Sequence, residues 1–226
     1  MTDWARFLPL SNRDRADDAA VSRDRSPAVA SVLTATAAVL DARPDLLPAP
    51  TLRPEVTVEA AVRELLSELG APWWRRWARA VGALESPRPE VAALASGALA
   101  SALHARAAAL GATARRASIH DLRTTVVLAL ELNAAHRAEI VVDPLVCGAA
   151  ALDLALRSRM PQRAVVTARS LVAVDGDWRV GRGPELHASG AAIVLFLAGR
   201  ADIPAESAPP ALPGPGTDAD EPRDLG

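Results

Sequence analysis

Apolar residues recur every three or four positions in several stretches of this chain, which is the spacing of an α-helix with one buried face. The first stretch begins at Ser26-Pro27 and ends before Pro44. Serine caps helix starts and proline suits the first turn, so the pattern predicts a helix that Ser26 caps. A second helix is predicted from Thr57 to Gly70, because glycine is a common helix stop.

Three later stretches are also predicted to be helical. Residues 86–111 read as one helix with a face of small residues. Residues 122–132 contain the β-branched run Thr124–Val127, which suits a strand as well, but their length and the lack of turn residues favour a buried helix. Asp143-Pro144 then predicts the cap and first turn of a helix that continues to Arg159.

Residues 71–84 are predicted to be another helical piece, in which Trp73 and Trp77 would share a face with Val81 and Leu84. Tryptophan interleaved with arginine can bind single-stranded nucleic acid or lie at a membrane interface. The net charge of -2 over 226 residues supplies no field that supports either partner. The favoured interpretation is that both tryptophans belong to the core.

The periodicity changes after Ala164, where β-branched and alternating residues predict strands. A strand from Val165 is expected to turn at Asp175-Gly176 and return through Trp178. A third strand and an apolar helix over 189–198 follow. Trp178 is expected to anchor the hairpin on that helix.

Together these elements predict a mainly α fold with a small α+β lobe. An antiparallel helix bundle is expected over 26–160 and the small mixed domain over 161–203. Residues 1–25 are dense in Asp and Arg, and residues 204–226 are rich in Pro, Gly and Asp. Both are therefore predicted to be flexible, the second as a disordered tail.

The composition argues for a folded protein and against nucleic acid or a membrane as its partner. With 50% hydrophobic residues the chain can bury a core, and the near-neutral charge gives no reason to expect nucleic acid or membrane as a partner. Neither a signal peptide nor a window of about 18 apolar residues is visible, so a cytoplasmic protein is expected.

The C-terminal segment carries a resemblance to a known family. Trp178, the Gly181–Pro184 loop and the Leu197–Arg200 stretch occur in the order expected for the C-terminal domain of the mycothiol-dependent maleylpyruvate isomerase family. Members resemble a DinB-like, metal-binding four-helix bundle joined to a sterol-carrier-like domain. The resemblance would cover about residues 26–203.

The family's metal ligands are not all matched. Where the second helix of the family carries a ligating histidine, this chain has Glu64. The preferred alignment puts Val126 and Leu130 at the two ligand positions of the fourth helix, which implies a degenerate site without metal. A shifted alignment puts Glu139 and Asp143 there, which would give three carboxylates for a divalent ion.

Other side chains are candidates for binding a ligand. His120-Asp121 is favoured as a helix start capped by Ser118, and His136 is favoured as part of a wet helix face. Cys147 could be a nucleophile only if a helix N-terminus lowered its pKa; an inert core residue is the favoured interpretation. The ligand-binding candidates are Glu64, His120, Arg123, Glu131, His136, Trp178 and Arg200.

Two functions remain open. The resemblance implies a mycothiol-dependent isomerase or S-transferase, in which Glu64 and a nearby arginine hold the thiol cofactor or an acidic substrate. The alternative is a non-catalytic relative whose cleft binds a small molecule or a protein. A shared fold cannot choose between them.

Overall fold

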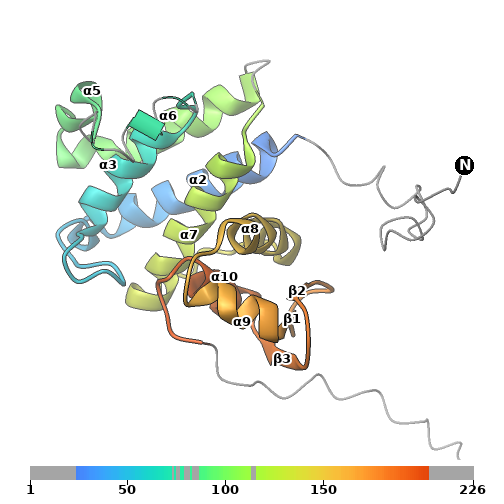
Figure 1. Cartoon of the computed structure of the whole chain (residues 1–226). Coiled ribbons are helices and arrows are strands. Elements are labelled where there is room, and N and C mark those ends of the chain that lie inside the picture. Colours follow the sequence, from blue (N-terminus) through green and yellow to red (C-terminus); the bar gives the residue numbers. More distant parts are fainter. Residues whose placement is uncertain are drawn as a thin grey trace, which may run out of the picture.

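The computed structural model describes residues 24–72, 74, 77–78, 82, 87–112 and 116–203. The predictions for residues 1–23, for Trp73 and for residues 204–226 lie outside this part of the chain. Within it the protein is mainly helical and carries one small three-stranded sheet (Figure 1). None of the helices described there has both the length and the apolar character needed to cross a bilayer.

The N-terminal part is a group of helices that bury their apolar faces on one another. Helix α2 packs on α6 and α7, and α3 packs on the same two helices (Figure 1). Val29, Leu33, Val62, Leu103 and Val126 are among the fully buried side chains of their shared core. The elements of this part are α2 (Ser26–Ala42), η2 (Pro44–Leu46), α3 (Val58–Glu68), α5 (Pro89–Ala92), η3 (Ser96–Ala98), α6 (Leu99–Ala112) and α7 (Ile119–His136).

Most of the predicted helix starts are confirmed. The Thr57 hydroxyl accepts a hydrogen bond from the amide of Ala60 at the start of α3. Ser118 and Asp121 form a reciprocal capping box at the start of α7. The helical interpretation of residues 122–132 is confirmed, since α7 includes all of them.

The prediction that Ser26 caps the first helix is wrong. Ser26 is already helical, and its hydroxyl accepts a hydrogen bond from the amide of Ala117, which lies in the segment before α7. The carboxylate of Asp24 accepts from the amide of Ser26 instead. A distant chain segment thus uses the serine that local sequence assigned to the cap.

The single helix predicted over 86–111 is also wrong, because it is divided into α5, η3 and α6. Arg63 on α3 explains the interruption. Its guanidinium donates to the carbonyl oxygens of Val91, Ala92 and Leu94 at 2.6, 3.2 and 2.8 Å. These carbonyl groups are satisfied by a side chain from another helix, so the backbone can leave the helical path there.

Trp77 does not lie in the core, since 62% of its surface is exposed. The core interpretation is therefore wrong for this residue. Helical spacing says which side chains share a face, but whether another element covers that face depends on the tertiary arrangement.

In the C-terminal part, helices pack against a small sheet (Figure 1). Its elements are α8 (Pro144–Arg157), α9 (Gln162–Ala168), β1 (Ser170–Ala173), β2 (Arg179–Gly181), β3 (Glu185–Ala188) and α10 (Gly190–Leu197). The predicted start of α8 is confirmed, because the carboxylate of Asp143 caps it by accepting from the amide of Leu145. The predicted hairpin with its turn at Asp175-Gly176 is confirmed, because β1 pairs antiparallel with β2. The start predicted for its first strand is wrong, because residues up to Ala168 belong to α9 and β1 begins at Ser170.

The sheet has the order β2-β1-β3. Strand β1 pairs antiparallel with β2, and in this pair Leu171 lies opposite Val180. On its other side β1 pairs parallel with β3, and there Leu171 lies opposite Leu186. The loop between β2 and β3 requires glycine at Gly181, whose φ is +101° and whose added Cβ would collide with the carbonyl oxygen of Arg169.

Helix α10 joins the two parts. It packs on α8, on α7 and on β1, and one continuous cluster of buried side chains runs from α2 to α10. The division into 26–160 and 161–203 remains a prediction. Helix α8, which that division assigns to the bundle, packs on both α7 and α10.

Candidate functional site

A pocket of about 280 Å³ lies between α3 and α7. Leu154 of α8 and the residues just after α10 complete its wall. The lining residues are Arg53, Ala61, Glu64, Leu65, Glu68, Arg123, Thr124, Val127, Leu128, Glu131, Leu154, Ala198 and Arg200.

The pocket follows one face of each helix. The α3 residues are spaced by three and four from Ala61 to Glu68, and the α7 residues run in the same way from Arg123 to Glu131. Eight residues of helix correspond to about 12 Å, so the pocket is elongated along α7. Leucine and valine side chains line its middle, whereas charged side chains lie toward both ends.

At one end, two arginines converge on a buried carboxylate. The Glu131 side chain is only 2% exposed, and its Oε1 forms ion pairs with Nε of Arg200 and, at 3.9 Å, with Nε of Arg53. Nη1 of Arg53 also lies 3.6 Å from Oε2 of Glu64, whose side chain is 51% exposed. Burying Glu131 is tolerable because guanidinium groups offset its charge.

The geometry at Glu131 leaves hydrogen-bonding capacity unused. Among the described residues, Glu131 Oε1 and the Nε atoms of Arg53 and Arg200 are buried without a hydrogen bond of good geometry. The groups are close enough for charge attraction but are not aligned as a bidentate pair. Unsatisfied buried polar atoms are uncommon, and here they lie together in the wall of a pocket.

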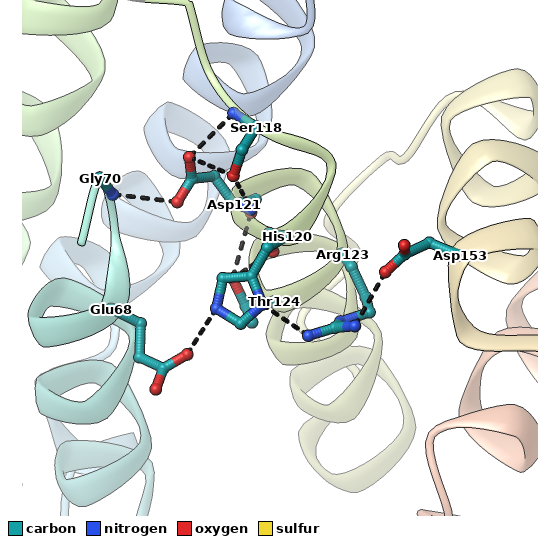
Figure 2. Close-up of polar contacts among 8 residues, drawn as sticks. All are labelled: Glu68, Gly70, Ser118, His120, Asp121, Arg123, Thr124 and Asp153. Carbon is teal, nitrogen blue, oxygen red and sulfur yellow. Dashed lines mark hydrogen bonds and ion pairs between the residues drawn. The ribbon is translucent and has the colours of Figure 1, made fainter. Parts of the chain in front are cut away.

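At the other end, a chain of polar contacts links α3, α7 and α8 (Figure 2). Nε2 of His120 lies 2.6 Å from Oε2 of Glu68, and Nδ1 of the same ring lies 2.6 Å from Nη2 of Arg123. Nη1 of Arg123 donates to Asp153 at 2.8 Å, and Asp153 also accepts from Arg157. Glu68 and Arg123 line the pocket, and His120 connects them.

These contacts determine the tautomer of His120. A guanidinium group can only donate, so Nδ1 must accept and carry no proton. The proton is therefore on Nε2, which donates to the Glu68 carboxylate. His120 in this arrangement is neutral and has a fixed orientation.

Asp121 holds the α3 and α7 ends in place next to this chain of contacts. One carboxylate oxygen accepts from the amide of Gly70 at 2.9 Å, and the other accepts from Ser118 (Figure 2). The C-terminal end of α3 is thereby tied to the first turn of α7. This connection positions Glu68 beside His120.

The structure brings four of the sequence candidates into the pocket wall: Glu64, Arg123, Glu131 and Arg200. His120 lies against two lining residues. His136 is outside the pocket, where its Nε2 lies 2.8 Å from the carbonyl oxygen of Pro50. Trp178 is also elsewhere, since its ring lies against Gly148 of α8 and Gly190 of α10.

Two charged residues of the pocket lining, Arg53 and Glu68, were missed by sequence reasoning. Glu68 follows Glu64 by four positions, so the helical spacing could have found it. Arg53 lies in the proline-rich connection before α3, where no periodicity indicates which way a side chain points. Only the folded chain places it beside Glu131.

Cys147 does not meet the condition for a nucleophile. It is buried in the first turn of α8, outside the pocket. Burial, with smaller contributions from Asp175 and Asp143, raises the pKa of its thiol to about 11. The neutral thiol therefore predominates, and the favoured interpretation as a core residue agrees with its position.

The described residues do not fit a divalent metal centre. They contain no group of three His, Cys, Asp or Glu side chains placed to hold an ion. Val126 and Leu130 are buried apolar residues of α7. Of the alternative set with Glu64, Glu139 is exposed after the end of α7 and Asp143 caps α8, so the structure does not gather these three carboxylates.

The fold and site define a mainly helical protein with a small mixed sheet and an elongated, charged pocket between two helices. No protein-family model, no curated protein and no solved structure matches the chain.

Proposed function

We propose that the protein binds a small organic acid in the pocket between α3 and α7. We also propose that it is a relative of the mycothiol-dependent maleylpyruvate isomerase family without the family's metal site. In that proposal α2, α3, α6 and α7 correspond to the DinB-like antiparallel four-helix bundle, and residues 161–203 correspond to the sterol-carrier-like domain.

The observation that carries the proposal is the pair of guanidinium groups at Glu131. Arg53 and Arg200 are partly buried, both line the pocket, and both approach the same carboxylate oxygen. Each guanidinium has five N–H donors, many more than one oxygen can accept. A ligand carboxylate that enters the pocket can accept the remaining donors, while its apolar part lies on Leu65 and Val127.

The Glu68–His120 contact favours an enzyme as the second candidate. A carboxylate paired with a neutral imidazole can accept a proton from a bound molecule without a metal. The pocket lining includes no cysteine, so a reaction of the isomerase or S-transferase type would need a thiol cofactor such as mycothiol to bring its own sulfur. Glu68 and the arginines would then orient the cofactor and substrate.

Titration with octanoate tests the binding function. Octanoate has one carboxylate and an apolar chain that suits the elongated pocket. We expect octanoate to shift the amide NMR signals of residues along α3 and α7. It should also slow the hydrogen exchange of the guanidinium groups of Arg53 and Arg200. In Arg200→Gln and in Arg53→Gln the affinity should fall at least tenfold, because a hydrogen bond to a charged group contributes about 1.5–3 kcal/mol.

Arg179→Gln is the matched control, since Arg179 is exposed on β2 and lies outside the pocket. Its affinity for octanoate should equal that of the parent. Circular dichroism would verify that each variant is folded. Unchanged octanoate affinity in both folded pocket variants would disprove the proposal.

A further inference from the structure

We propose that two copies of the chain associate through the exposed side of α8, with the two helices antiparallel about a twofold axis. The surface consists of Val141, Leu145, Leu152, Leu156 and Met160, and we call it the α8 face. None of these residues lines the pocket, so the proposal goes beyond the proposed function and does not depend on it.

Exposed apolar side chains are concentrated on this part of the molecule. The five residues of the α8 face are between 55% and 86% exposed. The other large apolar side chains that are exposed in the described part of the chain are Trp74, Trp77 and Ile203, which belong to other segments. The buried side of α8 packs on α7 and α10 (Figure 1). Single exposed apolar residues are common in monomers, whereas a group of them on one helix marks an interaction surface.

The spacing along α8 is that of a contact between two helices. Leu145, Ala149, Leu152 and Leu156 follow one another by four, three and four positions. This alternation places all four residues on one stripe and is the pattern of the contacting residues in a coiled coil. The small side chain of Ala149 in the middle of the stripe allows a second helix to approach closely.

The stripe is also self-complementary. When two copies of α8 lie antiparallel, Leu145 can lie opposite the partner's Leu156, and Ala149 opposite the partner's Leu152. The same register pairs the apolar residues just outside the helix, which are Val141 and Met160. A twofold interface requires such a surface, because each patch must fit an identical copy of itself.

The charges at the ends of α8 favour a second copy and the antiparallel direction. Asp143 is exposed at the start of the helix, and Arg157 and Arg159 are exposed at its end. Arg157 is paired with Asp153 of its own helix, so Arg159 is the better partner for an acid of the second copy. In the antiparallel arrangement Asp143 lies near the partner's Arg159, whereas a parallel arrangement would bring like charges together.

The apolar area suits a weak dimer. A large aliphatic side chain exposes on the order of 100 Å², and those of the α8 face are exposed by about three quarters on average. The α8 face therefore offers roughly 350 Å² of apolar surface per copy. A standard interface buries about 800 Å² per partner, of which somewhat more than half is apolar. The five side chains thus supply most of the apolar area that a stable dimer needs, and we expect a dissociation constant in the micromolar range.

Sedimentation equilibrium of the full chain, from low micromolar to submillimolar concentration, tests the association. We expect the mean mass to rise from the monomer mass of 23.6 kDa toward twice that value. Leu152→Glu should weaken the dimer at least tenfold, because it places two carboxylates in an apolar contact near the twofold axis. Trp77→Glu is the matched control, since Trp77 is exposed on another segment, and its dissociation constant should equal that of the parent. Circular dichroism would verify that each variant is folded.

A cycle of charge substitutions at low ionic strength tests the direction of the helices. Arg159→Glu should weaken the dimer about fivefold, because the new carboxylate would face the partner's Asp143. Asp143→Asn removes that charge and keeps a side chain that can cap α8. When it is combined with Arg159→Glu, it should restore part of the lost affinity, a coupling that helices aligned in parallel would not show.

The unfavourable outcomes are distinct. A chain that remains a monomer at the highest concentration would overturn the inference, whatever else covers the α8 face. Dimerisation of folded Leu152→Glu with the affinity of the parent would show that the copies meet elsewhere. Additive effects of the two charge substitutions would show that the helices are not antiparallel. None of these results bears on octanoate binding, because the α8 face lies outside the pocket.

Discussion

At the scale of single residues, three glycines explain where Trp178 lies. A Cβ added to Gly148 would be 2.9 Å from Cγ of the indole ring, and one added to Gly190 would be 2.9 Å from its Cζ2. A Cβ added to Gly176 would be 2.8 Å from Nε1 of the same ring. The ring therefore occupies space that any larger residue on α8, on α10 or in the turn would take. The predicted role of Trp178 as a packing anchor agrees with this position.

Trp178→Ala should lower the free energy of unfolding by about 3 kcal/mol or more, because it leaves a cavity where three backbone segments meet. Urea denaturation followed by circular dichroism measures the change. Gly148→Ala should also destabilise, since its new methyl group would press on the ring. Trp77→Ala is the control: that side chain is exposed, and its loss should change stability by less than about 0.5 kcal/mol. Equal effects of the two tryptophan substitutions would refute the anchoring role.

Cys147 should react slowly with iodoacetamide in the native protein. With the pKa of its thiol raised to about 11 from 9.0, the thiolate fraction at pH 8 is about a hundredfold smaller than that of an ordinary thiol. The rate should rise at least that much when urea unfolds the chain. Rapid alkylation of folded protein at pH 8 would contradict the buried, neutral thiol.

The raised pKa of the Cys147 thiol makes the free energy of unfolding depend on pH in the alkaline range. The folded state holds the Cys147 proton more tightly than the unfolded state does. Its contribution to stability is therefore present below pH 9 and is lost as pH rises toward 11. Cys147→Ala should show a smaller loss of stability over this window, measured by urea denaturation at several pH values.

At the scale of elements, Arg63 determines how the chain passes from α5 to α6. It binds three carbonyl groups of that segment and also donates to Glu59 at 2.7 Å, while Ser96 donates to the same Glu59 oxygen at 2.9 Å. The division of the expected helix therefore depends on contacts between α3 and residues about thirty positions later. A local pattern of small residues contains none of this information.

Arg63→Ala should destabilise the protein by about 2–3 kcal/mol and speed amide hydrogen exchange in residues 89–98, because several charge-assisted hydrogen bonds are lost. Arg63→Lys should recover only part of the protection, since one ammonium cannot reproduce the planar fork of donors. Arg179→Ala, an exposed arginine on β2, is the control. Unchanged exchange in residues 89–98 of Arg63→Ala would show that the segment holds its shape without Arg63.

The stabilisation by Arg63 should also depend on pH. Hydrogen bonds from Arg63 and then Ser96 lower the pKa of Glu59 from its usual value of 4.5. A lowered folded-state pKa means that the contribution is present above pH 4.5 and disappears as pH falls through the lowered value. The stability difference between the parent and Arg63→Ala should therefore narrow in acid.

At the scale of the whole molecule, the pocket depends on charges that come from four separate parts of the chain. We expect protein purified without chelator to carry less than one equivalent of zinc, because Val126 and Leu130 are apolar and Glu64 is paired with Arg53. Elemental analysis of the purified protein measures this. One zinc per chain that is lost in Glu64→Ala would contradict this expectation.

Several elements could be predicted because their signals are local. The Thr57, Ser118 and Asp143 caps and the apolar stripes of α2 and α3 depend on residues within a few positions of one another. The first strand starts later than predicted because the β-branched residues from Val165 also fit a short helix, and here they pack as part of α9 against the sheet. Local preference for a strand is weaker than the packing that overrides it.

The mainly helical class, most helix boundaries, the loop after β2 and four of the residues that line the pocket could be predicted from the sequence. The folded chain was needed to show that Arg53 joins them, that His136 and Trp178 lie elsewhere, and that Arg63 binds the segment that divides the expected helix. The physical reason is the distance along the chain between the residues that interact. Helix periodicity and capping act over a few residues, whereas a buried carboxylate such as Glu131 acquires its arginine partners only when α7, the connection before α3 and the segment after α10 have come together.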